Sequence, residues 1–333
     1  MVKLIDVART AGVGAGTASR ALSGNGSVDR ETKERVIAVA KQLGYSPDVA
    51  ARALRERRTR TIGLLLPDLA NEFYTASVAV LQQELSDAGY QLVIASTGND
   101  PSTERIALQT MIDQRVEGIV HVPVDADLVL PTTVPIVQLN RQSASRQAAA
   151  ASDDLAGVDE LTTAIVHAGH RDIAVIVGPT GFSTSRNRLL GALRAAERAG
   201  IPQSERPLDG ARLRVRHAPL TVDGGAQAVA QLFPDLPSCL IALSSRLVMG
   251  ALRECGDRGI HVPESLSLAG YGDPDWFSIW RPGITTFAPN LTEMGRQAAR
   301  LLLAQLAGEE TGPPALIPGK VQVRGSVTGL SAG

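Results

Sequence analysis

The 333-residue chain is close to neutral, with 33 lysine and arginine residues against 34 aspartate and glutamate residues. No apolar run approaches the length that crosses a bilayer, which argues against a membrane-spanning protein. The charge is unevenly placed, because the first 60 residues carry 12 basic against 6 acidic side chains and the remainder carries 21 against 28. A short basic module on an acidic body indicates nucleic-acid binding, since neutralising phosphates releases condensed counterions.

Three short helices are predicted in the basic head. The first has its apolar residues on one face at helical spacing: Leu4, Val7, Ala8 and Ala11. Gly12 ends that helix, and a second helix follows from about residue 15 to residue 22. A third begins at Asp29, a suitable N-cap. Two short helices joined by a glycine-containing turn form a helix-turn-helix pattern, so we expect a small DNA-binding head.

The rest of the chain alternates between short apolar strands and helices. Strands are predicted at residues 62–67, 90–95, 118–122, 136–139, 173–177, 239–243 and 266–271. Helices are predicted at residues 78–88, 103–114, 155–168, 186–199, 224–232 and 247–258. Strands alternating with helices of this length predict an α/β body of two doubly wound parallel-sheet lobes.

A set of short motifs resembles the lactose/galactose repressor family of bacterial transcription regulators. In the head and just after it, the matching pieces lie at residues 5–8, 11–13, 17–20, 44–47, 50–54 and 59–63, where the family reads DVA, AGV, TVSR, LGY-x-P, AAR-x-L and RTRTIG. Further matches lie at residues 71–74, 118–119, 168–173, 188–191, 250–252, 262–263 and 285–286. The resemblance therefore covers essentially the whole chain, and it implies a periplasmic-binding-protein-like body behind the head.

Four parts follow from this resemblance. Residues 1–46 form the helix-turn-helix DNA-binding domain, and residues 47–60 form the hinge helix and linker. Residues 61–155 with 289–318 form an N-terminal effector lobe, and residues 156–288 with 319–329 form a C-terminal effector lobe. The family places the chain crossings between lobes near residues 153–156, 287–290 and 318–319. A ligand would then bind between the lobes, beyond the carboxyl ends of the strands.

The N-terminus and the cysteines indicate a cytoplasmic protein. The first residues include charged Lys3, Asp6 and Arg9 in place of the apolar stretch of a signal peptide. The two cysteines, Cys239 and Cys255, fall in a predicted strand and a predicted helix, so no disulfide framework is indicated. A periplasmic solute-binding protein would need a signal peptide and has no DNA-binding head.

The resemblance implies that the second helix enters the major groove with its N-terminal half against the bases. The family carries larger polar groups at the first positions, whereas Ala15 and Gly16 offer only apolar contact, for example to a thymine methyl. Thr17 and Ser19 can hydrogen-bond to phosphates or bases, and Arg20 to a guanine edge or a phosphate. The alternative is that Thr17 and Ser19 are ordinary exposed helix residues.

Residues 47–56 match the family's hinge helix, which becomes ordered on DNA. Leu54 matches the side chain that enters the minor groove and kinks the duplex. Ala51 and the neighbouring alanines are small enough to let two hinge helices lie side by side. Arg55 and the arginines after it would bind phosphates. The alternative is an alanine-rich linker helix with an exposed leucine.

The family dimerises through its body, so we expect a homodimer on a palindromic double-stranded operator. The last residues, Thr-Gly-Leu-Ser-Ala-Gly and those before them, have no heptad repeat, which favours a dimer over a tetramer. No cofactor, metal or membrane partner is expected.

The resemblance places a small-molecule effector against Phe73, Tyr74, Asn140, Thr184, Arg188, Ser244, Arg246 and Asp273. The two aromatic residues match a pair that packs on a ligand ring, and they are as well suited to covering the interface between the lobes. Arg188 matches an arginine that binds hydroxyls or carboxylates.

Three polar anchors of the family are changed. The acid after the fourth strand is Asn140, the Asn-Asp pair is Ser244-Ser245, and the first Asp of the Gly-aromatic-Asp-Asp string is Gly272. Those acids normally accept hydrogen bonds from neutral sugar hydroxyls. Their loss favours an anionic or weakly polar effector, such as a sugar acid or a sugar phosphate, over a neutral hexose.

Two arginines support that hypothesis, because Arg188 is kept and Arg246 is added beside the serines. In the alternative arrangement Arg246 points to solvent, and Asp273, Asp275 or Trp276 turns inward.

No catalytic motif is present. The five histidines are scattered, and no GxSxG, P-loop or strand–helix GxGxxG occurs. We therefore predict a non-enzymatic, sequence-specific DNA-binding regulator, a repressor by the habit of the family, controlled by a sugar or sugar derivative bound between two lobes. The alternative is a cytoplasmic small-molecule sensor with little sequence-specific DNA binding.

Overall fold

The computed structural model describes residues 2–23, 27–45, 58–128, 134–145 and 147–330. Two compact units divide the chain, residues 1–59 and residues 60–333. The predicted hinge helix, with its DNA-contact residues Ala51, Leu54 and Arg55, lies outside the described residues.

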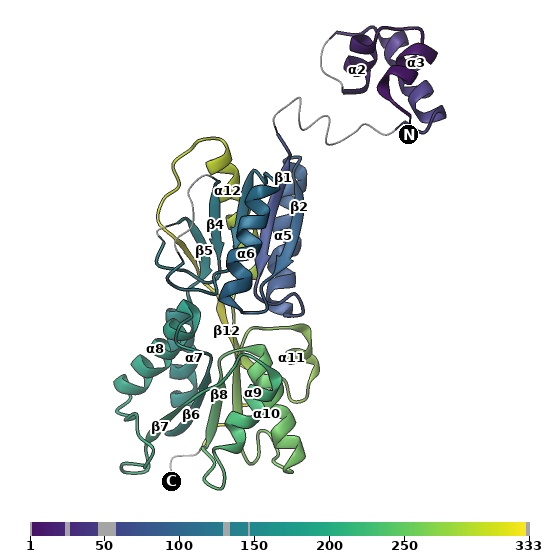
Figure 1. Ribbon diagram of the computed structural model, residues 1–333. Helices are drawn as coiled ribbons and strands as arrows, with labels where there is room; N and C mark the ends of the chain where they lie inside the picture. The colour runs from purple at the N-terminus through teal and green to yellow at the C-terminus, as the bar shows by residue number, and fades with distance from the viewer. Residues whose placement is uncertain (1, 24–26, 46–57, 129–133, 146, 331–333) are drawn as a thin grey trace. The chain divides into compact units, whose positions relative to one another are not determined.

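The first unit contains the three predicted helices (Figure 1): α1 (Leu4–Thr10), α2 (Ala15–Ser23) and α3 (Arg30–Gln42). Gly12 ends α1 with φ +68°, a conformation that glycine adopts without strain. The carboxylate of Asp29 caps α3 by accepting the Thr32 N–H at 2.8 Å. The sequence therefore predicted the start of α3 to the residue.

The core of this unit is built mainly from small apolar side chains. Its buried residues are Val7, Ala8, Ala11, Ala18, Ala21, Val36 and Ala40. Alanine at these contacts lets three short helices approach closely. Outside this core, Ala15, Gly16 and Arg20 of α2 are exposed.

The described residues of the second unit form two six-stranded sheets. The first sheet has the order β11-β5-β4-β3-β1-β2, with strands β1 (Thr61–Leu66), β2 (Gln91–Ser96), β3 (Gly118–His121), β4 (Ile136–Leu139), β5 (Ala149–Ser152) and β11 (Ala315–Ile317). The second has the order β12-β10-β9-β8-β6-β7, with strands β6 (Asp172–Val177), β7 (Arg212–His217), β8 (Cys239–Ala242), β9 (Ser267–Tyr271), β10 (Thr285–Ala288) and β12 (Lys320–Gln322). Two doubly wound sheets are thus confirmed, although β12 pairs antiparallel with β10.

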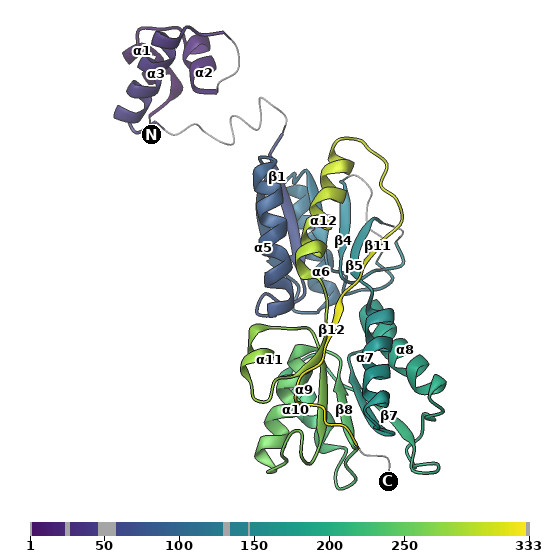
Figure 2. The same ribbon diagram turned by 180° about the vertical axis from the view of Figure 1, so that it is seen from behind.

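Helices cover both faces of each sheet (Figures 1 and 2). The N-terminal lobe, built on the first sheet, carries α5 (Glu72–Asp87), α6 (Pro101–Asp113) and α12 (Leu291–Leu306). The C-terminal lobe, built on the second, carries α7 (Asp154–His167), α8 (Ser183–Arg198), α9 (Val222–Ala230), α10 (Ser245–Asp257) and α11 (Asp275–Ile279). None of the helices in the described ranges is long and apolar enough to span a membrane.

Several elements differ from the sequence prediction. The helix expected from residue 78 begins at Glu72, because the Asn71 side chain caps it by accepting the Phe73 N–H at 3.1 Å. The elements β5, β7, β10, β11, β12, α11 and α12 were not predicted. Most are short or carry residues of low strand propensity.

The chain passes between the lobes at three places, after Ser152, after Ala288 and after Ile317. Phe287 lies at this junction. A Cβ added to Gly157 or Gly319 would come within 2.2 Å and 2.4 Å of its ring. The two glycines therefore make room for the aromatic ring that fills the junction. The four domain boundaries given above stay a prediction.

Candidate functional site

One surface of the head is formed by α2, which carries five of the predicted DNA contacts: Ala15, Gly16, Thr17, Ser19 and Arg20. The first two and the last are exposed, and the other two are half-buried. Ala18 and Ala21 point into the core and hold the helix on the head. The structure thus brings the predicted contacts onto one short helix.

Packing does not explain the glycine at the start of this helix. A Cβ added to Gly16 would meet nothing within 4 Å. Glycine costs a helix about 1 kcal/mol relative to alanine. The packing of the head therefore does not require glycine at this position.

A cavity lies between the two lobes of the body. It is lined by Pro67, Asp68, Asn71, Phe73, Tyr74, Asn99, Asn140, Arg141, Thr184, Arg188, Leu220, Ser244, Ser245 and Tyr271. Six of the eight predicted effector contacts are among them: Phe73, Tyr74, Asn140, Thr184, Arg188 and Ser244. Arg246 and Asp273 are not.

Aromatic rings from both lobes meet at this cavity. Phe73 packs edge-on against Tyr74, with ring centroids 5.3 Å apart, and lies 6.3 Å from Tyr271 of the other lobe. The two aromatic residues of α5 therefore both line the cavity and cover the contact between lobes. The two alternatives left open by the sequence are compatible.

Arg188 is fully engaged with its own lobe. Its Nε donates to Asp154 at 3.0 Å, and its Nη1 donates to the Leu243 carbonyl oxygen at 3.0 Å. Its guanidinium lies 3.4 Å from the centre of the Tyr271 ring, and the Tyr271 hydroxyl donates to the other oxygen of Asp154 at 2.5 Å.

These contacts set the charge of this buried group. Burial lowers the pKa of Arg188, but the Asp154 carboxylate together with Tyr271 and Tyr74 more than offsets this, so the pKa lies above its ordinary value. Burial raises the pKa of the Tyr271 hydroxyl. The Arg188 charge is thus neutralised by a residue that the sequence analysis did not consider.

Arg141 is a cavity residue that the sequence analysis missed. It follows β4, is 4% exposed, and lies 3.7 Å from the centre of the Phe182 ring. Its Nη1 donates to Asn99 Oδ1 at 3.1 Å and weakly to the Pro123 carbonyl oxygen at 3.5 Å. Burial lowers the pKa of Arg141, and the positive charge of Arg188 acts in the same direction, against opposing effects of Tyr74 and Glu104. No carboxylate of the described residues lies within salt-bridge distance of it.

Asn140, beside it, has an unusual backbone and an unused acceptor. Its φ is +63°, a left-handed conformation that asparagine tolerates better than most residues. The side chain is 5% exposed, and its Oδ1 accepts no hydrogen bond from any described residue. A buried acceptor of this kind favours a ligand that can donate to it.

The remaining two predicted contacts lie elsewhere. Arg246 reaches across to the N-terminal lobe, where its Nη2 donates to the Ala70 carbonyl oxygen at 2.7 Å and approaches Asp68 at 3.4 Å. Asp273 accepts two hydrogen bonds from Arg324, at 2.7 and 2.8 Å. Neither side chain lines the cavity, because each is paired with a protein group that is distant in the sequence.

A second contact joins the lobes just after β4. The Gln142 N–H donates to Ser183 Oγ at 2.8 Å. The cavity volume is about 40 Å³, enough for water but far below the roughly 300 Å³ or more of ordinary ligand sites. A sugar can enter only if the lobes separate and contacts such as these break.

A wider groove of about 840 Å³ lies in the N-terminal lobe, along residues 134–148 and 305–314. Glu309 is the one ionisable side chain among the described residues that line it. The groove therefore offers fewer groups to orient a ligand than the cavity between the lobes.

Known proteins resemble both units. Residues 3–48 match the family of bacterial regulatory proteins, lacI family, and residues 162–327 match a periplasmic binding protein-like domain. The ribose operon repressor of Bacillus subtilis is 31% identical over 307 residues, 91% of each chain. The transcriptional repressor CytR of Escherichia coli is 27% identical over 337 residues, 98% of this chain and 96% of the relative.

Solved structures agree with these matches. A transcriptional regulator CelR–cellobiose complex aligns with a TM-score of 0.73 at 29% identity, over 98% of this chain and all (100%) of that one. The lac repressor dimer bound to operator and an anti-inducer has the same fold, with a TM-score of 0.85 at 24% identity over 98% and 99% of the two chains. The relatives are regulators of transcription, and this chain belongs to the LacI family of bacterial transcription regulators.

Proposed function

We propose that the protein represses transcription by binding a palindromic operator as a homodimer, under the control of a sugar or sugar derivative bound between its lobes. The observation that carries the DNA-binding part is the exposed start of α2, held on a packed three-helix head. A short helix presented in this way fits the major groove.

Within this proposal the residues of α2 divide by chemistry. Ala15 and Gly16 would lie against base edges, where small side chains allow apolar contact with a thymine methyl. Thr17, Ser19 and Arg20 would hydrogen-bond to bases or phosphates. Leu54 would enter the minor groove, with Ala51 beside it and Arg55 on the backbone, as the motif match predicts.

An exposed apolar sheet edge supports the homodimer. The outer strand β2 carries Val93 and Ile94, each 42% exposed. An unpaired apolar edge strand is normally covered, because it otherwise promotes uncontrolled association. A second copy of the chain over this edge would give the two-fold symmetry that a palindromic operator requires.

The proposed effector contacts are the six predicted residues that line the cavity together with Arg141. Relatives named for a ribose operon and for a cellobiose complex favour a sugar or sugar derivative. Since the lobes must separate for entry, a ligand would favour one lobe arrangement over another and so change operator affinity. Action on chromosomal DNA would place the protein in the cytoplasm, and we infer no catalytic role.

Capture of sheared genomic DNA by the purified protein, followed by sequencing, tests the DNA-binding part. We expect a few enriched sites with two-fold symmetry. Arg20→Ala should lose most of this enrichment, whereas Arg30→Ala, which removes an exposed arginine of α3 paired with Glu34, should keep it. Uniform, salt-sensitive recovery with and without a small-molecule cell extract would instead support a ligand sensor with little sequence-specific DNA binding.

A further inference from the structure

The charged groups that line the cavity are not equally neutralised. Among them, Arg188 lies 3.0 Å from Asp154, and Asp68 lies 3.4 Å from Arg246. Arg141, which is 4% exposed, has no such partner among the described carboxylates. The cavity therefore keeps one positive charge that the protein leaves unpaired.

We infer that Arg141 is the residue that selects an effector with an anionic group, a carboxylate or a phosphate. This inference rests on the proposed function and refines its ligand class. Arg188 and Arg246 are less suited to bind an anion, because both already bind protein groups. A buried guanidinium without a counter-charge is costly, and an anion that binds it removes that cost.

The orientation of Arg141 suits a bound anion. The Phe182 ring, 3.7 Å from the guanidinium carbon, and Asn99, at 3.1 Å from Nη1, hold the group in place. Its Nε and Nη2 donate to none of the described residues. Two N–H groups of one planar guanidinium match the two oxygens of a carboxylate or phosphate.

Glu104 is the carboxylate that acts on the charge of Arg141, but its oxygens are occupied. It lies within 2.7 Å of His121 Nε2 and accepts the N–H groups of Val124 at 2.7 Å and Asp125 at 2.9 Å. Glu104 therefore holds the loop after β3 in place, and it does not approach the guanidinium as a counter-ion.

Asn140 extends the same site from an anion to a sugar derivative. Its buried Oδ1 can accept a hydroxyl, while Arg141 beside it binds a carboxylate or phosphate. A sugar acid or sugar phosphate supplies both groups in one molecule, and a neutral sugar supplies only one.

Calorimetric titration of the full-length protein tests the inference. The ligands are matched pairs, D-glucose with D-gluconate and with glucose 6-phosphate, D-ribose with ribose 5-phosphate, and inorganic phosphate as the simplest probe. We expect the anionic member of at least one pair to bind at least about tenfold more tightly than its neutral partner, since a hydrogen bond to a charged group contributes about 1.5–3 kcal/mol.

Arg141→Gln should abolish this preference and Arg141→Lys should keep part of it, because the lysine retains the charge without the fork. Arg194→Gln, which removes an exposed arginine of α8, is the matched control and should bind like the parent.

Three results would overturn the inference: tighter binding of the neutral member, equal loss of both members in Arg141→Gln, or no binding by any anionic probe. Arg141→Gln has the same basic head as the parent, so any binding of anions to the head appears in both titrations and cancels when they are compared. Failure of the parent protein to enrich an operator would contradict the proposed function alone, because calorimetry reports small-molecule binding independently of DNA.

Discussion

Arg141 and Arg188 line the same cavity from different lobes, and both are more than nine-tenths buried. Arg188 has a carboxylate, a carbonyl oxygen and a tyrosine ring around it. Arg141 has an amide oxygen, a distant carbonyl oxygen and a phenylalanine ring. The two side chains are buried to a similar degree, so their partners, rather than burial, decide whether the charge of each is neutralised within the protein.

The largest effect is expected from removing the partner of Arg188. Asp154→Ala should lower the free energy of unfolding of the body by about 3–5 kcal/mol, because it leaves a buried charge unpaired and removes the acceptor of the Tyr271 hydroxyl. Denaturant unfolding monitored by circular dichroism measures this. Asp159 lies on α7 like Asp154, and it forms a more exposed pair with Arg198 of α8. Asp159→Ala is therefore the control and should cost less than about 1 kcal/mol. Equal losses would contradict the structural role of Arg188.

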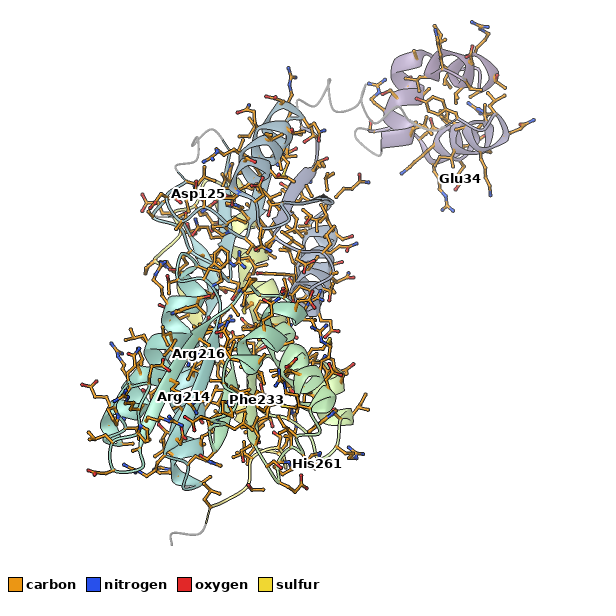
Figure 3. All side chains as sticks on the ribbon, turned by 60° about the horizontal axis from the view of Figure 1, so that its bottom comes forward. Glu34, Asp125, Arg214, Arg216, Phe233 and His261 are labelled. Carbon is orange, nitrogen blue, oxygen red and sulfur yellow. The ribbon has the colours of Figure 1, made fainter. Side chains whose placement is uncertain are left out.

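A second set of buried arginines, on β7, extends the comparison away from the cavity. Figure 3 labels Arg214 and Arg216 on this strand. Asp172 accepts hydrogen bonds from Arg212 at 2.9 Å and from Arg214 at 3.3 Å. Asp172→Ala should therefore destabilise the body by about 2 kcal/mol, less than Asp154→Ala because Asp235 also neutralises these arginines.

The control for that variant is Glu205→Ala, since Glu205 pairs with Arg216 at an exposed position. Scanning calorimetry of thermal unfolding measures the loss of stability in each of the two variants. A smaller loss for Asp172→Ala than for Glu205→Ala would mean that burial of β7 does not depend on this carboxylate.

A smaller effect is expected where an arginine joins the two lobes. Arg246→Ala should change the free energy of unfolding by less than about 1 kcal/mol, because the group is partly exposed. It should nevertheless speed amide hydrogen exchange in residues 68–75, since the contact with Ala70 is lost. Arg253→Ala breaks a surface pair with Asp223 within one lobe and should leave that exchange unchanged. The same exchange rates in both variants would show that Arg246 does not hold the lobes together.

The smallest effect concerns a basic residue whose pKa shift favours its neutral form. Burial lowers the pKa of His170, although its contact with the Thr328 carbonyl oxygen at 2.9 Å acts in the other direction. Below about pH 6.5 the unfolded chain then binds more protons than the folded protein, so stability should fall as the pH falls.

His170→Gln should weaken that dependence, and the exposed His217→Gln serves as the control. Unfolding free energies measured between about pH 5 and pH 8 make the comparison. An unchanged slope in His170→Gln would assign the pH dependence to other groups.

Elements missed by the sequence analysis have physical reasons in common. β5 consists of Ala149, Ala150, Ala151 and Ser152, which have low strand propensity, and it becomes a strand because β4 and β11 pair with it on both sides. β7 alternates arginine with apolar residues, which is the pattern of a half-buried strand, so this strand did carry a local signal that the sequence analysis missed. Arg212 and Arg214 can be buried on it because Asp172 and Asp235 neutralise them.

Local order along the chain was enough to predict the three head helices, the alternation of strands and helices, the family motifs, and six of the cavity residues. Local spacing is sufficient for these, because helix periodicity and strand composition involve near neighbours. Which cavity arginine pairs with a carboxylate depends on tertiary contacts. Arg188 meets Asp154 across 34 residues and Arg246 meets Ala70 across 176, and no local pattern encodes contacts at such separations. Arg141 is left without a carboxylate because folding brings none of the described ones to it.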